Sequence, residues 1–183
     1  PYPINEPIVR IRQEGGLWRL LGEVSLERKN PLRSGNFKEA FKNRMLFVFG
    51  TQGTPEENAW SLAKARYDAE TFWYRGNGAV EVIPDTAFAI ERDPDRNVIL
   101  YGNSETNGAW KPLLANAPIL VSRSRVQIGT EEFTGDNLSC LFLYPRKGSD
   151  KATVGVVSGT GKEGLRLTER LPYFVSGVAY PDF

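Results

Sequence analysis

The stretch that decides the fold is Met45-Leu46-Phe47-Val48-Phe49-Gly50-Thr51-Gln52-Gly53-Thr54-Pro55-Glu56-Glu57-Asn58. Its first five residues are apolar, a run that is too short for a buried helix and typical of a strand covered on both faces. Thr54 stands at the expected helix N-cap, with Pro55 at the first helical position and Glu57 at the third, which makes a capping box. A buried strand, a turn of small residues and a capped helix together predict the opening of a parallel β-α-β unit.

Residues 55–75 are predicted to form the principal helix. Its apolar side chains recur every three or four residues and so form one stripe that faces a sheet: Leu62, Ala65, Ala69, Phe72 and Trp73. Trp60, Ala63 and Tyr67 form a second, flanking stripe. We interpret this second stripe as packing of the helix on the sheet rather than as a surface for ligand stacking.

Further apolar runs predict the remaining strands. Val80–Asp85 and Val98–Tyr101 follow the helix, and the second of these runs is apolar throughout, as in a central strand. A helix kept short by Pro112 is expected after Gly102–Asn107. Residues 119–121 and 125–133 have the pattern of an antiparallel hairpin, and 138–144 and 152–157 are expected to form two more strands. Lys162–Arg170 is expected to form a final helix.

These elements predict an α/β fold of three layers, flavodoxin-like or Rossmann-like, with a mostly parallel sheet and an antiparallel β extension at one edge. Residues 1–44 are expected to form an N-terminal arm with a β-hairpin, because Ile8–Arg12 alternates and Leu17–Leu21 returns after a Gly-Gly turn. Residues 45–183 are expected to form the α/β domain, in one compact unit with the arm.

Composition excludes several classes of function. The formal net charge of the 183 residues is +1, which provides no electrostatic argument for nucleic acid or for an anionic membrane. No apolar window approaches the length of a bilayer span, so no membrane span is expected. The sequence begins with Pro1 and shows no secretory leader, so we interpret it as a mature product or an excised piece.

The chain contains no histidine and a single cysteine. The first absence removes Ser-His-Asp and Cys-His triads and His-ligated zinc from this chain considered alone. Cys140 lies in the apolar run Leu138–Leu143, where a thiol has no internal disulfide partner and is expected to be inert. We therefore expect no catalytic residue, no metal site and no cofactor.

The candidate binding site lies where ligands bind in open α/β sheets, beyond the carboxyl ends of the strands. Small and polar residues gather there, and the candidates are Thr51, Gln52, Thr54, Asp85, Asn103, Asn107 and Thr160. The loop Gly50–Thr54 resembles the phosphate loop of flavodoxins, at a helix N-terminus. Glu56 and Glu57 in the first turn would repel a phosphate, so we favour a capped turn without a ligand.

The other motifs give weaker evidence for a function. No dinucleotide-binding glycine motif and no P-loop is present. Ser158 has Val156 where a nucleophile elbow needs glycine. Asp85 and Glu105 could pair as two catalytic acids, although turn formation and helix capping explain them as well. Arg166 and Arg170 could clasp an anion, with a solvated helix face as the default interpretation.

Four segments carry a family resemblance: Ser34–Phe41 leading into Leu46–Thr51, then Arg96–Asn103, then Val154–Gly161. Together they resemble the accessory α/β domain beside the catalytic domain in large bacterial hydrolases of the prolyl-oligopeptidase and esterase type. The resemblance implies that the Ser-Asp-His machinery belongs to an α/β-hydrolase domain of the same polypeptide, the expected partner. It also implies a secreted parent, periplasmic or extracellular, and assigns no catalytic residue to this chain.

Three functions therefore stay open. The first is a non-catalytic accessory or interaction domain of a larger serine hydrolase. The second is a flavodoxin-like module that binds a small ligand at the glycine-rich strand ends. The third is a self-contained enzyme that uses Asp85 and Glu105.

Overall fold

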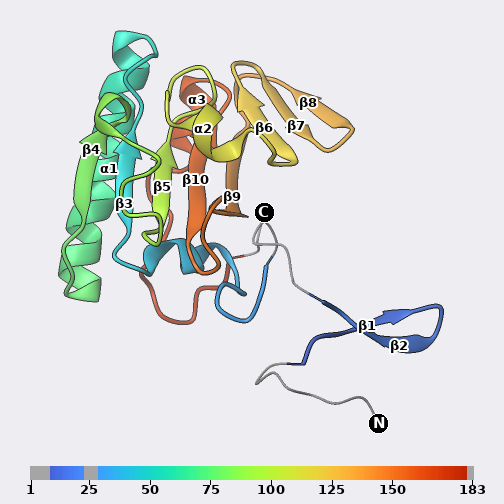
Figure 1. Ribbon diagram of the computed structural model, residues 1–183. Helices are drawn as coiled ribbons and strands as arrows, with labels where there is room; N and C mark the ends of the chain where they lie inside the picture. Colours follow the sequence, from blue (N-terminus) through green and yellow to red (C-terminus); the bar gives the residue numbers. More distant parts are fainter. Residues whose placement is uncertain (1–8, 23–28, 181–183) are drawn as a thin grey trace.

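The computed structural model describes residues 9–22 and 29–180, and its centre is a five-stranded sheet. The sheet order is β4 (Glu81–Pro84), β3 (Leu46–Phe49), β5 (Val98–Tyr101), β10 (Thr153–Gly159) and β9 (Ser139–Pro145). The first four strands run parallel, and β9 pairs with β10 in the antiparallel sense (Figure 1).

The three inner strands β3, β5 and β10 are covered on both faces. Every residue of β5 and of β10 is buried, as the continuous apolar character of such strands requires. Alternate side chains enter two cores on opposite faces of the sheet: Val48 and Leu100 on one, Phe47 and Tyr101 on the other.

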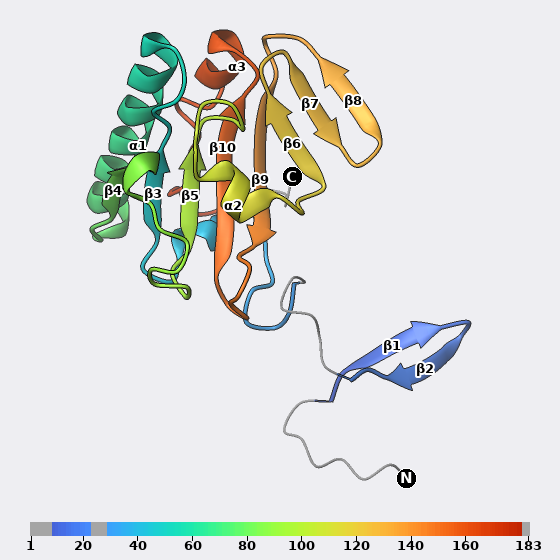
Figure 2. The same cartoon turned by 45° about the horizontal axis from the view of Figure 1, so that its top comes forward.

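Different elements cover the two faces. On the Phe47 face lie α1 (Pro55–Gly76) and a short 3-10 helix, η1 (Phe37–Phe41), which buries Phe37 and Ala40. On the Val48 face lie α2 (Trp110–Leu114) and a three-stranded antiparallel sheet of β6 (Ile119–Ser122), β7 (Arg125–Ile128) and β8 (Glu131–Thr134), as Figure 2 shows. The other helices of the described residues are η2 (Asp85–Ala87) and α3 (Lys162–Arg166).

The start of α1 is as predicted. The Thr54 hydroxyl accepts from the Glu57 amide at 3.3 Å, and the Glu57 carboxylate accepts from the Thr54 amide at 2.7 Å. Pro55 occupies the first turn, and Asn77 caps the other end of the helix in the left-handed conformation, with φ of 50°. The local sequence therefore sets both ends of α1.

The predicted three-layer flavodoxin-like or Rossmann-like fold is wrong. The described residues contain ten strands in three sheets, and α1 is the only helix longer than five residues. The face opposite α1 carries the five-residue α2 and an antiparallel sheet in place of a helical layer. The physical reason lies after Leu114, where a period-two pattern forms hairpins instead of crossover helices. The strand expected at 152–157 is present as β10, and it pairs with β5 in the parallel sense.

An N-terminal hairpin joins β1 (Ile11–Glu14) to β2 (Leu17–Leu20). All eight residues of the two strands are exposed, and the hairpin lies apart from the five-stranded sheet in Figures 1 and 2. None of the helices in ranges 9–22 and 29–180 is long and apolar enough to cross a membrane.

Candidate functional site

Asp85 is the centre of the polar residues at the strand ends. It lies in η2, directly after β4, and is 6% exposed. Its carboxylate accepts hydrogen bonds from the Thr51 hydroxyl at 2.5 Å, from the Thr51 amide at 3.2 Å and from the Gly108 amide at 2.6 Å. Asp85 thus connects the loop after β3 to the loop before α2. Its donors are two backbone amides and one hydroxyl of the protein itself.

Two buried asparagines join the same loops. The Asn107 amide donates to the carbonyls of Val48 and Tyr101, at 3.0 and 2.9 Å, so it links the ends of β3 and β5. The Asn103 amide donates to the carbonyl of Gly159 at 3.1 Å, which links β5 to β10. Both side chains are 1% exposed, so their polar groups are directed at the backbone and away from solvent.

Of the other predicted site residues, Thr160 and Thr54 also bond within the protein, and Gln52 is exposed. Thr160 is buried, and its hydroxyl bonds the amide and the carbonyl of Leu138. Thr54 caps α1. Gln52 is exposed, and its side-chain nitrogen lies close to Gly108, 2.5 Å from where a Cβ atom on that glycine would be. The structure therefore brings Thr51 and Asp85 together directly, while Asn107 bonds the backbone beside them. Every predicted side chain except Gln52 is engaged within the protein.

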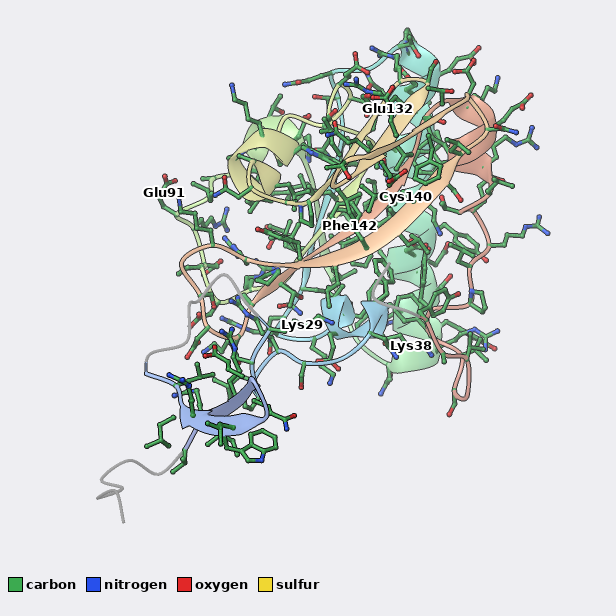
Figure 3. All side chains as sticks on the ribbon, turned by 90° about the vertical axis from the view of Figure 1, so that its right-hand side faces the viewer. Lys29, Lys38, Glu91, Glu132, Cys140 and Phe142 are labelled. Atoms are coloured by element: carbon green, nitrogen blue, oxygen red, sulfur yellow. The ribbon has the colours of Figure 1, made fainter. Side chains whose placement is uncertain are left out.

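The other candidate catalytic groups are bonded within the protein or lie inside strands. Glu105 accepts from the Arg123 amide at 2.6 Å, and the Arg123 guanidinium donates to Glu57 instead of to a substrate site. Ser158 is fully buried in β10, and its hydroxyl has no hydrogen-bond partner among the described residues. Cys140 lies on β9 (Figure 3). Burial raises the pKa of its thiol to about 11, which disfavours the nucleophilic thiolate.

The described ranges hold no group of three His, Cys, Asp or Glu side chains that could bind a metal ion.

Sequence reasoning missed a buried charged cluster between α1 and the sheet. The Lys64 ammonium donates to the Asp68 carboxylate at 2.7 Å and to the Glu169 carbonyl at 3.2 Å. The hydroxyl of Tyr101, from β5, donates to the other Asp68 oxygen at 3.1 Å. The ring of Tyr173 lies 4.8 Å from the Lys64 nitrogen, a cation–π contact. The cluster fastens α1 both to the sheet and to the chain that follows α3.

A groove opens beside this cluster, with a volume of about 240 Å³. Side chains of α1 form one wall and residues after α3 form the other, and the lining residues are Trp60, Ala63, Lys64, Tyr67, Glu169 and Arg170. The signal in the sequence was the flanking stripe of Trp60, Ala63 and Tyr67, which the helix-on-sheet interpretation had assigned to packing. Tyr67 is 48% exposed, so packing does not account for it.

We expect Asp68→Asn to change how stability depends on pH. Burial raises the pKa of Asp68 from its ordinary 3.8 to about 6, since the low-dielectric interior disfavours the charge more than Lys64 favours it. A raised pKa stabilises the fold below the unfolded-state pKa, and this contribution is lost as the pH rises through about 6. The asparagine variant does not titrate and has no such loss. Its unfolding free energy, relative to that of the wild type, should therefore be higher at pH 7 than at pH 4.

Urea denaturation of both proteins at the two pH values measures this change. The quantity compared is the difference between the two unfolding free energies, because other carboxylates titrate equally in both proteins. A difference that is the same at both pH values, or that moves in favour of the wild type at pH 7, would contradict the prediction.

Comparison with known protein families, curated proteins and solved structures finds no match to this chain.

Proposed function

We propose that this chain is a non-catalytic accessory or interaction domain of a larger secreted serine hydrolase of the peptidase or esterase type. In this proposal its partner is the catalytic α/β-hydrolase domain of the same polypeptide, in the periplasm or outside the cell. The resemblance of four segments to such accessory domains suggests the partner. The exposed apolar face of the β1–β2 hairpin is the observation that carries the interaction.

The hairpin has two different faces. Residues directly opposite each other in an antiparallel pair share a face, and Ile11 pairs with Leu20 while Gln13 pairs with Trp18. That face therefore presents three large apolar side chains, with Ile11 54%, Trp18 66% and Leu20 50% exposed. The other face pairs Arg12 with Arg19 and Glu14 with Leu17, so it carries three charged side chains and one apolar side chain, Leu17, which is 67% exposed.

Such a face is costly to leave in water. An isolated two-stranded hairpin is marginally stable at best, and clustered exposed apolar side chains mark interaction sites. Burying each of Ile11, Trp18 and Leu20 against a partner contributes roughly 1.5–3 kcal/mol. The hairpin therefore fits a docking element better than it fits a free arm.

The distribution of reactive groups agrees with a partner that performs the chemistry. The chain has no histidine, Ser158 is buried inside a strand, and the pKa of Cys140 is raised to about 11. The strand-end residues, engaged with one another and with the backbone, offer no comparable support for a small-ligand site there.

The test is active-site labelling with a fluorophosphonate probe, on this chain and on its full-length polypeptide side by side. We expect the probe to label a serine of the full-length polypeptide and none in this chain. The labelled domain, separated and mixed with this chain, should bind it. Labelling of a serine in this chain, or of none in the full-length polypeptide, would contradict the proposal.

The same binding assay tests the hairpin. The double variant Trp18→Ser, Leu20→Ser should weaken binding at least tenfold, because about 1.4 kcal/mol corresponds to each factor of ten and two apolar anchors are lost. Leu167→Ser is the matched control, since Leu167 is also exposed, at 61%, but lies after α3. Equal affinities for the wild type and the double variant would rule out docking through this face.

A further inference from the structure

We propose that a pocket between α2 and the β6–β7 hairpin binds a small carboxylic acid with an apolar body. The proposal rests on three properties of the described residues: the size of the pocket, its mostly apolar wall, and a lining that holds donors and one cation but no acid. None of the lining residues belongs to the β1–β2 hairpin, and the proposal does not depend on a serine hydrolase partner.

The pocket is large enough for a small molecule. Its volume is about 450 Å³, and sites for small molecules hold roughly 300–1,000 Å³. Its lining residues come from α2, from the chain that joins α2 to β6, and from β6 and β7, with Ser104 of the loop after β5. Figure 2 shows α2 leading into β6 on the face of the five-stranded sheet that carries Val48.

The protein holds the walls of the pocket in place by itself. The Trp110 ring lies edge-on to Phe142 of β9, with the ring centroids 6.0 Å apart. The Gly129 amide, after β7, donates to the Pro118 carbonyl, before β6, at 2.7 Å. A ligand therefore meets a surface that is already ordered, which avoids part of the entropic cost of binding.

The wall suits an apolar body. Seven of the eleven lining residues have apolar side chains. Trp110, Leu114 and Ile119 belong to the core, at 3%, 3% and 6% exposed, and also line the pocket. A polar or sugar-like ligand would lose its water against these side chains without gaining hydrogen bonds, whereas an apolar one is stabilised by the burial.

The polar groups of the lining select an acid. Lys111 is the only charged lining residue; it is exposed and forms no ion pair with any residue in 9–22 or 29–180. The indole N–H of Trp110 can only donate, and no described residue accepts from it. An ammonium and an indole N–H both complement a carboxylate, and neither can accept from an amine. Since no acidic residue lines the pocket, nothing there neutralises Lys111 or repels a carboxylate.

The test is titration of the ¹⁵N-labelled chain with decanoate, below its micelle concentration, followed at the indole N–H signal of Trp110. That signal is the one that persists in Trp18→Phe, Trp60→Phe and Trp73→Phe. We expect a saturable shift, with an affinity about tenfold higher for decanoate than for the neutral decanol, and no saturable shift with decylamine. No saturable shift with decanoate, or equal affinities for decanoate and decanol, would overturn the proposal.

Lys111→Met tests the charge. Methionine is a good helix former of similar length, so the melting temperature should stay within a few degrees while the affinity for decanoate falls to that for decanol. Lys147→Met is the matched control, because Lys147 is an exposed lysine outside the pocket, and it should leave both affinities unchanged. Wild-type affinity for decanoate in Lys111→Met, or an equal loss in Lys147→Met, would exclude the proposed site.

Ala117→Leu tests where the apolar body lies. A larger side chain in the wall takes up part of the volume, so decanoate and decanol should both bind several-fold more weakly. Ala115→Leu, at an exposed residue of the same lining, is the second variant if thermal unfolding shows that Ala117→Leu disturbs the fold. Unchanged affinities in the folded variants would contradict the proposal. Shifts of the Trp110 signal that depend on protein concentration without ligand would identify a second copy of the chain as the occupant and also contradict it.

Discussion

Replacing Arg146 with methionine is expected to lower the free energy of unfolding by about 4 kcal/mol. The Arg146 guanidinium is buried after β9 and donates to four backbone carbonyls, those of Asp93 and Arg96 at 2.8 and 2.6 Å and those of Ile90 and Arg92 at 3.0 and 3.2 Å. Methionine fills much of the space and leaves these buried acceptors without their charged donor. The loop before β5 then loses the group that orders it.

Urea denaturation followed by circular dichroism measures the effect. Lys147→Met is the matched control, because Lys147 is the adjacent residue and is exposed, so its substitution should change stability by less than about 0.5 kcal/mol. Arg146→Lys should recover only part of the loss, since a single ammonium cannot reach four carbonyls in the planar geometry of a guanidinium. If Arg146→Met and Lys147→Met are equally stable, the four hydrogen bonds do not hold the loop.

Gly50→Ala is expected to cost about 3 kcal/mol, at the upper end of what added core atoms cost. Gly50 directly follows β3, where its amide donates to the Ser61 hydroxyl at 2.8 Å and to the Tyr101 carbonyl at 3.2 Å. A Cβ atom on Gly50 would clash with the carbonyl oxygen of Thr106 and lie 2.9 Å from its carbonyl carbon. Both are backbone atoms of a buried loop, so neither can move aside as a flexible side chain would.

Thermal unfolding of Gly50→Ala beside Gly22→Ala checks this expectation. Gly22 has open space around the position of an added Cβ, so its alanine variant should unfold at nearly the wild-type temperature. A melting temperature of Gly50→Ala within about one degree of the wild type would show that the loop of Thr106 adjusts freely.

The elements that the sequence predicted well are those that neighbouring residues decide. The capping box of Thr54 and Glu57 and the buried strand before it are local, and both are present. The order of the layers depends instead on how distant segments pair. Nothing near Thr153–Gly159 distinguishes a parallel central strand from an antiparallel one, because a buried strand is apolar in either case.

The polar residues at the strand ends show a second limit. Asp85, Asn103 and Asn107 have the side chains expected of a ligand site, and the same side chains are the ones that satisfy buried backbone groups. The sequence contains no signal that separates the two uses. Lys64 and Asp68 misled the sequence interpretation in the opposite direction. A lysine and an aspartate four residues apart are typical of a solvated helix face, but here both side chains lie in the interior.

The position of β10 has a consequence for how the chain reaches its fold. β10 lies between β5 and β9, so the sheet is split until residues 153–159 are in place. Its partner β5 belongs to a much earlier part of the chain, with α2, β6, β7, β8 and β9 between them. Pairings of this long range close large loops and form slowly. During synthesis the edges of the earlier strands stay uncovered until β10 has emerged, so we expect any chaperone contact with the chain to fall in this interval.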